Sequence, residues 1–379
     1  MIKLGIEKID EYLHIFKNKK VGLITNPTGV DQKLKSTVDI LNEKVELVSL
    51  YSPEHGIRGD LQAGEKLDTY IDEITGLTVY SLYGATRRPT KEMLENVDVL
   101  CFDIQDVGAR FYTYIYTMAY AMMAAKDYEV DFVVFDRPNP VGGTKVEGNI
   151  LDINYRSFVG YYPLLQRHGL TIGELAKLFN EEYEIGCNLH IIPMEGWQRS
   201  MEYKDTNLNW VLPSPNLPTV ESTYTYLATC YFEGTNVSEG RGTTKPFSFF
   251  GAPWMKNREL IKLLNEKNFE GVMFREVYFT PTFSKHANEL CKGIELIVTD
   301  YDKFSPVFLG MTLLHLIEDL HDEFEYRGPY SSKGHPMIDL LTGGNFIRER
   351  TKTLDEIKDL FEDSKEKFIQ VKGKYHLYE

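Results

Sequence analysis

Residues 45–59 read VELVSLYSPEHGIRG, an apolar segment followed directly by a polar loop. The alternating apolar side chains of residues 45–51 predict a strand. Residues 52–59 then place Glu54, His55 and Arg58 among glycines and a proline, a mixture that suits a ligand-facing loop better than a packed element. Open α/β sheets bind ligands at the carboxyl ends of their strands. The alternative is a well-capped turn in which Arg58 pairs with Glu54.

The same succession of strand and polar loop recurs along the first half of the chain. Continuous apolar strands separated by helices indicate a parallel sheet that is covered on both faces. Each strand is followed by a loop rich in glycine, proline and polar residues. We expect strands near residues 20–25, 45–51, 77–83, 97–103, 132–136 and 189–194, and helices near 36–43, from 90, at 111–127 and at 171–180.

Three prolines between residues 211 and 218 mark a candidate domain boundary. A chain of 379 residues is long for one core, so two domains are expected. We place the first domain at residues 1–215 and the second at 216–379. The second half is expected to contain a strand at 293–299, a helix at 308–321 and a charged amphipathic helix at 353–367.

Composition describes an ordinary globular protein, with 42% hydrophobic and 26% charged residues. The formal net charge of −14 argues against nucleic acid and anionic membranes as partners. The beginning of the sequence lacks an apolar core of signal-peptide length, so we expect a cytoplasmic protein, or a secreted one if a leader was removed. The four cysteines, which lie far apart in the sequence, are expected to be buried thiols in a reducing compartment: Cys101, Cys187, Cys230 and Cys291.

Several familiar signatures are absent from the sequence. No GxGxxG follows the first strand, the glycines at 234 and 240 do not form a phosphate-binding loop, and neither HExxH nor GxSxG occurs. No cysteine and histidine set has zinc spacing. We therefore expect neither a cofactor nor a metal, although Glu54, His55 and Asp103 leave a metal site open.

What remains is a set of charged side chains on loops. Two carboxyl groups with a surrounding set of hydrogen-bond donors are what glycoside hydrolysis needs. The competing interpretation is that these groups form ion pairs that hold the loops together. The carboxylates are Glu54, Asp103, Asp106, Asp136, Glu233 and Glu239, and the arginines among them are Arg58, Arg110, Arg137, Arg167 and Arg241.

Seven blocks, in this order, resemble one family, the exo-acting β-N-acetylmuramidases (NamZ-like, glycoside hydrolase family 171). The resemblance runs from about residue 21 to the C-terminus. The blocks are SPEHGIRG (52–59), FDIQDVGARFYTYIYTM (102–118), FDRPNPVGG (135–143), FVGYYPLLQRHGLTIGELA (158–176), PSPNLPT (213–219), FEGTNVSEGRGTTKPF (232–247) and GAPW (251–254).

This resemblance implies a Rossmann-like first domain, a smaller α/β (α+β) second domain and an active site in the cleft between them. It implies release of a terminal N-acetylmuramic acid from the non-reducing end of peptidoglycan-derived saccharides. The family's catalytic glutamate falls on Glu54, and its second-domain tyrosine is placed on Tyr278, with Tyr231 as the alternative. We expect substrate contacts from His55, Arg58, Asp103, Gln105, Asp106, Arg110, Arg137, Asn139, His168, Asn236, Glu239 and Arg241.

Three routes remain open for stabilising the glycosyl centre: a second carboxylate (Asp106 or Glu239), a tyrosine nucleophile, or help from the substrate's N-acetyl group with Tyr278 orienting it. Arg58 and Arg241 are expected to bind the lactyl carboxylate of the sugar. Two other functions would suit the same charged loops. One is a muropeptide- or sugar-binding protein without catalysis, and the other is a metal-dependent transferase or hydrolase. Turnover of a chromogenic N-acetylmuramide would distinguish an enzyme from the binding protein. Loss of activity in EDTA would indicate the metal-dependent enzyme.

Overall fold

The computed structural model describes residues 2–54, 56–57, 69–84, 86–329, 331–332 and 334–379. Its first domain contains strands β1 (Lys20–Thr25), β2 (Glu46–Ser52), β3 (Tyr70–Ile71), β4 (Thr78–Ser81), β5 (Val99–Asp103), β6 (Asp131–Phe135) and β7 (Leu189–Ile192). These form one sheet in the order β3-β4-β2-β1-β5-β6-β7. All neighbours are parallel except β3 and β4. The strand order reverses between β1 and β5. A ligand is therefore expected near this point, outside the carboxyl ends of the strands.

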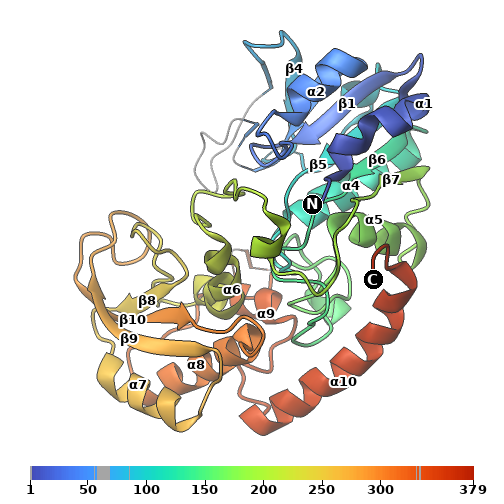
Figure 1. The fold of residues 1–379 in the computed structure, drawn as a ribbon. Coiled ribbons are helices and arrows are strands. Elements are labelled where there is room, and N and C mark those ends of the chain that lie inside the picture. The colour runs from blue at the N-terminus through green and yellow to red at the C-terminus, as the bar shows by residue number, and fades with distance from the viewer. Residues whose placement is uncertain (1, 55, 58–68, 85, 330, 333) are drawn as a thin grey trace.

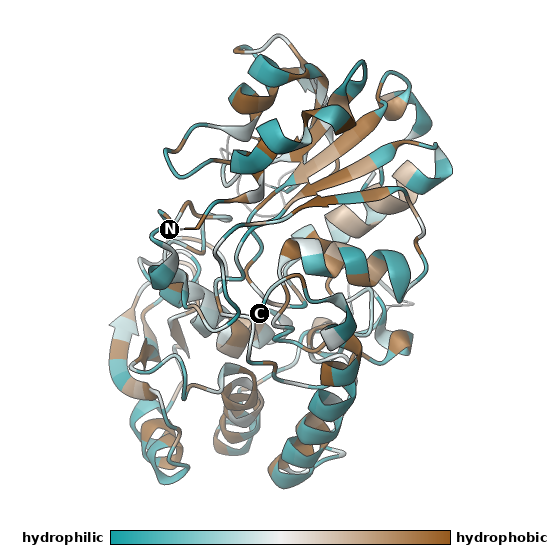
Figure 2. Ribbon diagram, turned by 45° about the vertical axis from the view of Figure 1, so that its right-hand side comes forward, coloured by the Kyte–Doolittle hydropathy of each residue, from teal (hydrophilic) through white to brown (hydrophobic). Residues whose placement is uncertain are grey.

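Helices cover both faces of this sheet. The helical elements are η1 (Gly5–Tyr12), α1 (Leu13–Phe16), α2 (Thr37–Lys44), α3 (Lys91–Leu94), α4 (Tyr114–Asp127), η2 (Ile153–Tyr155), α5 (Ile172–Glu181) and η3 (Tyr203–Thr206). One core joins α4 and α5 to the sheet, and a second core joins η1, α1 and α2 to the opposite face. Figure 2 shows the strands largely in brown, as expected for strands that are covered on both sides.

The second domain is built on a three-stranded antiparallel sheet. Its strands are β8 (Phe249–Ala252), β9 (Val272–Phe279) and β10 (Cys291–Val298), in the order β8-β10-β9. Figure 1 shows this smaller sheet apart from the first domain, with helices packed around it. The helical elements in this half of the chain are α6 (Val220–Thr229), η4 (Cys230–Gly234), α7 (Asn257–Glu266), α8 (Pro306–Leu320), α9 (Met337–Thr342), α10 (Leu354–Lys372) and η5 (Gly373–Tyr375). The predicted two-domain α/β fold is confirmed.

The end of the chain returns to the first domain (Figure 1). Lys372, at the end of α10, donates hydrogen bonds of 2.8 Å to the carbonyl oxygens of Gly143 and Gly169. The Tyr378 hydroxyl donates to Asp136 at the end of β6. A division at residue 215 therefore stays a prediction, and the last residues make contacts across it.

No helix of the described ranges is long and apolar enough to cross a membrane. All four cysteines are free and buried, as expected from the sequence.

Candidate active site

Glu54 lies immediately beyond the carboxyl end of β2. The backbone carbonyl of Glu54 accepts a hydrogen bond of 3.3 Å from the Tyr114 hydroxyl, which orients the loop. Its carboxyl group is hydrogen-bonded to Tyr83. Tyr83 follows β4, which is the parallel neighbour of β2 with Ser52 opposite Ser81. Parallel neighbours end at the same edge of a sheet, and this brings the two loops together.

Glu54 opens into a pocket of about 610 Å³ between the two domains. This volume is in the range of small-molecule sites. The first domain supplies its loops after β2, β4 and β5, and the second domain supplies α6, η4 and the segments around them. The lining residues are Glu54, Tyr83, Arg87, Phe111, Tyr112, Thr113, Ser157, Phe158, Val159, Ser214, Leu217, Tyr226, Glu233, Arg241, Phe247, Met337 and Leu340.

Aromatic rings form one wall of this pocket. The Phe111 ring centroid lies 5.3 Å from that of Tyr226, edge to face, and the Tyr112 centroid lies 5.8 Å from the same ring. The Phe247 centroid lies 4.8 Å from Tyr226. Such pairs pack rigidly, so the wall keeps its shape when the pocket is empty. An aromatic wall beside carboxylates suits a sugar ring, which has apolar faces and a polar edge.

The second domain contributes a carboxylate that is held by a chain of ion pairs. Glu233 Oε1 lies 2.7 Å from Arg241 Nη2, and Arg241 Nε lies 3.2 Å from Glu239 Oε1. Glu239 Oε2 lies 2.7 Å from Lys285 Nζ. Glu233 is half-buried at the pocket, while Glu239 and Lys285 are buried behind it. The arrangement fixes Glu233 at the part of the pocket that the second domain supplies.

The charges in this chain shift the pKa values of its members. Burial opposes the charge on Glu239, but Lys285 and Arg241 lower the pKa of Glu239 below its ordinary value. Burial opposes the charge on Arg241 too, and Glu233 and Glu239 outweigh it and raise the pKa of Arg241. On the other side of the pocket, burial and the neighbouring Glu54 raise the pKa of Tyr83 to about 12. Tyr83 is therefore a hydrogen-bond donor at neutral pH.

Among the predicted site residues that the structure describes, Glu54 and Arg241 line this pocket. His55 and Arg58 lie outside the described residues. Asp103 and Arg137 form a buried ion pair, with Arg137 Nε 2.5 Å from Asp103 Oδ1, and Thr37 also donates to Asp103. This is the loop-tying ion pair that the competing interpretation proposed.

The other predicted residues are also engaged by protein groups, and they do not line the pocket. Gln105 and Asn139 donate to backbone carbonyls, and Asn236 bonds the backbone at residues 323 and 325. His168 Nε2 lies 3.4 Å from Asp106 Oδ2. Arg110 is fully buried and donates to three carbonyls. Substrate contacts from these residues and from Glu239 stay predictions, and their geometry supports structural roles.

Tyr278 is half exposed on β9, and its hydroxyl donates to Glu276 at 2.9 Å. It lines a separate hollow together with Gly242 and Phe283. The alternative, Tyr231, is fully buried in the second-domain core. The tyrosines that do line the pocket with Glu54 are Tyr83, Tyr112 and Tyr226. The catalytic role predicted for Tyr278 therefore has no geometric support in the described residues.

Arg87 and Tyr83 were not predicted from the sequence as site residues, and Glu233 was predicted only as one of the loop carboxylates. Arg87 could have been predicted from the sequence, because it follows β4. This strand is the parallel neighbour of β2, so the loops after both strands leave the sheet on the same side. For Glu233, position in the sequence carries no such signal, since η4 reaches the pocket only through packing of the second domain.

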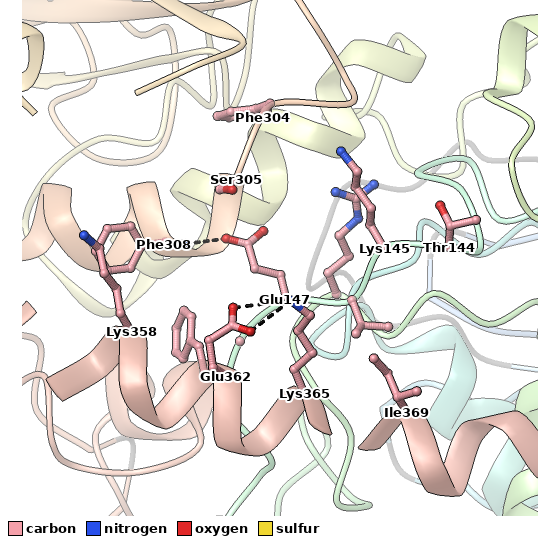
Figure 3. Close-up of a pocket in the computed structure, with 14 residues that line it drawn as sticks. Thr144, Lys145, Glu147, Phe304, Ser305, Phe308, Lys358, Glu362, Lys365 and Ile369 are labelled. Carbon is pink, nitrogen blue, oxygen red and sulfur yellow. Dashed lines mark hydrogen bonds and ion pairs between the residues drawn. The ribbon is translucent and has the colours of Figure 1, made fainter. Parts of the chain in front are cut away.

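A second cavity, of about 440 Å³, lies beside α8 and α10 (Figure 3). Its carboxylates already have partners. Glu147 accepts a hydrogen bond of 2.8 Å from the backbone N–H of Phe308 in the first turn of α8, and Glu362 pairs with Lys365 at 3.0 Å. Glu147 thus caps a second-domain helix from the first domain. This cavity therefore lies at the contact between the two domains. Across the described ranges no group of three or more potential metal ligands occurs.

The fold and the pocket define a two-domain α/β protein with carboxylates from both domains facing a sugar-sized, aromatic-walled pocket. Residues 21–221 match the family described as exo-beta-N-acetylmuramidase NamZ, N-terminal, and residues 224–378 match its C-terminal counterpart. The chain belongs to the exo-β-N-acetylmuramidase NamZ family, and the family predicted from the sequence blocks is confirmed.

Individual relatives agree with this assignment. The chain is 52% identical over 384 residues to the peptidoglycan beta-N-acetylmuramidase NamZ of Bacillus subtilis (strain 168), covering 100% of this chain and 91% of that protein. Two crystal structures of DUF1343 family proteins from Bacteroides fragilis NCTC 9343 have the same fold. The first has a TM-score of 0.90 at 40% identity and the second 0.81 at 32%, each covering 100% of this chain and 99% of the other.

Proposed function

We propose that this chain is an exo-acting β-N-acetylmuramidase that releases terminal N-acetylmuramic acid from the non-reducing end of peptidoglycan-derived saccharides. The observation that carries the proposal is the match of both halves of the chain to one enzyme family, with a full-length relative that is named for this activity. The pocket supports it with two carboxylates from different domains.

Glu54 is the proposed general acid. It lies on a loop whose backbone is held by Tyr114, and its carboxyl group has the Tyr83 hydroxyl as a hydrogen-bond partner. In the reaction Glu54 gives its proton to the glycosidic oxygen as the bond from that oxygen to C1 breaks. Water then supplies a hydroxyl to C1 and a proton that restores Glu54. Such proton transfer contributes about 10²–10⁴ in rate.

Glu233 is the proposed partner on the second domain. Bond cleavage leaves positive charge at C1, and a fixed carboxylate stabilises that charge. The ion pair with Arg241 at 2.7 Å holds the Glu233 carboxylate in place before the substrate arrives. Asp106 and Glu239, the carboxylates considered from the sequence, are buried against protein partners. Glu233 is therefore the carboxylate of the second domain that we assign to this step.

The test is hydrolysis of a disaccharide with terminal N-acetylmuramic acid, and of chromogenic N-acetylmuramide and N-acetylglucosaminide. Wild type should hydrolyse the muramides, and Glu54→Gln should lose about 10²–10⁴ in kcat on the disaccharide. Its loss on the chromogenic muramide should be smaller, because a good leaving group needs less protonation. Glu95→Gln, an exposed glutamate outside the pocket, is the matched control. Absence of wild-type turnover would refute the proposal, and full activity of Glu54→Gln would remove Glu54 from it.

The compartment proposed for this activity is the cytoplasm, and the four free, buried cysteines support it. Fractionation of cells that produce the native protein tests this point. The activity should remain with the soluble cell extract, and recovery from the medium would contradict it.

A further inference from the structure

Arg87 brings a positive charge to the pocket that contains Glu54. It is exposed, lies in the loop after β4 and lines the pocket. Its guanidinium carbon lies 4.0 Å from the Phe158 ring centroid. Within the described ranges, its guanidinium has no hydrogen bond or ion pair to another protein group. Its neighbour Arg88 differs in this respect, because it pairs with Asp127 and donates to the Met123 carbonyl at 2.9 Å.

Stacking on Phe158 holds Arg87 without using its donors. A guanidinium that lies over an aromatic face is attracted to the ring, while its N–H groups remain in its own plane. Those N–H groups fit the two oxygens of a carboxylate in a bidentate contact. Arg87 is therefore oriented toward one kind of ligand before that ligand binds.

The other described cation of the pocket, Arg241, is already neutralised. It lies between Glu233 and Glu239, at 2.7 and 3.2 Å, and Lys285 balances the remaining charge of that cluster. An anionic ligand would gain little from Arg241 and would meet Glu54 and Glu233 in the same pocket. The electrostatics thus leave Arg87 as the described lining residue that favours an anion.

We propose that Arg87 binds the lactyl carboxylate of the substrate and thereby selects N-acetylmuramic acid. This inference rests on the proposed function, because the 3-O-lactyl group is what distinguishes this sugar from N-acetylglucosamine. The carboxylate carries a negative charge into a pocket with two glutamates, in a chain of net charge −14. A specific enzyme must compensate that charge, and Arg87 does so.

The experiment varies both the residue and the charge of the ligand. Wild type, Arg87→Met and the control Arg88→Met are assayed on a chromogenic N-acetylmuramide and on its isosteric lactamide, in which the carboxylate is a neutral primary amide. Arg87→Met should lower kcat/KM on the carboxylate substrate by about ten- to a hundredfold, which corresponds to about 1.4–2.8 kcal/mol. On the lactamide it should change little. Arg88→Met should behave as wild type on both substrates.

Each outcome decides between explanations. If Arg87→Met discriminates between carboxylate and lactamide as strongly as wild type, the inference is wrong while the proposed function stands. Equal losses on both substrates also overturn it, since they indicate a general effect on the loop. If wild type hydrolyses no muramide at all, the proposed function fails and the inference fails with it. Equal urea midpoints for the three proteins exclude unfolding as the cause of a loss.

Discussion

Lys372 is a buried amine whose charge state should control how firmly the end of the chain is attached. It lies at the end of α10, is almost fully buried, and donates to the Gly143 and Gly169 carbonyls at 2.8 Å each. Burial, and then the nearby Arg199, lower the pKa of Lys372 to about 7, and Glu174 acts in the opposite direction. A neutral amine has two N–H donors, which is the number that these two carbonyls require.

The sign of the pH dependence follows from the two states of this amine. In the unfolded chain the pKa of Lys372 is near 10.5, so the unfolded state holds the proton more tightly than the folded state. The contribution of this group to stability is complete above about pH 10.5. It is lost progressively as the pH falls from there to about 7, below which both states hold the proton. Between pH 9 and pH 6 the loss amounts to about 2.5 kcal/mol. Lys372→Met removes this dependence.

The assay is urea unfolding of wild type, Lys372→Met and Lys367→Met at pH 9 and pH 6. Lys367 is the control, because it is exposed on the same helix and paired with Asp363. Lost hydrogen bonds and altered packing cost the same at both values of pH, so they cancel when the two differences are compared. Burial lowers the pKa of the nearby His376 to about 4, so the folded wild type keeps this side chain neutral between pH 9 and pH 6. The free energy of unfolding of Lys372→Met, measured relative to wild type, should be about 2.5 kcal/mol higher at pH 6 than at pH 9. An identical difference at both values would show that Lys372 keeps its proton when folded.

Glu239 is buried between Lys285 and Arg241, so Glu239→Gln should cost about 3–5 kcal/mol of unfolding free energy by leaving a buried cation unpaired. In urea unfolding the double variant Glu239→Gln/Lys285→Met should lose much less than the two single changes combined, and simple additivity would contradict this. Tyr278→Phe should leave kcat/KM unchanged, because its hydroxyl bonds Glu276 at the surface; a hundredfold loss would restore Tyr278 to the catalytic group. Stabilisation by Glu233 predicts that a trifluoroacetamide substrate reacts at a similar rate, and steep slowing would transfer that role to the substrate's N-acetyl group.

The first domain was predictable because its strands carry a local signal. β5 is buried along its whole length, and its apolar run is what a parallel strand between two helical layers requires. The antiparallel edge pair escaped prediction because β3 has two residues and its pairing depends on β4. α4 begins at Tyr114, three residues after its expected start at Phe111, because the preceding residues pack into the core of the second domain.

The site was less predictable because a charged residue at a strand end can either form a buried ion pair or face a pocket. Asp103 is the last residue of β5 and Glu54 lies just beyond β2, so both stand at strand ends of one sheet and both precede polar loops. Asp103 meets Arg137 from the neighbouring strand and is buried in an ion pair, whereas Glu54 remains half-buried at the pocket. The difference depends on which side chain the loop after the neighbouring strand places beside the carboxylate. That depends on tertiary packing, which no spacing within one motif records.

The domain junction itself bears on how the pocket works. Arg110 of the first domain is fully buried and donates to the Leu341 carbonyl at 3.0 Å, and Gln166 Nε2 donates to the Thr342 carbonyl at 3.1 Å. Glu147 holds the first turn of α8 from the same side. Separating the domains would break each of these hydrogen bonds between buried groups, at a cost of about 1–3 kcal/mol apiece. A protein that captures a sugar by closing two lobes needs a junction that opens easily, and this junction resists opening. The pocket is therefore formed before the substrate arrives, and Glu54 and Glu233 already face it from opposite domains, as catalysis by fixed charges requires.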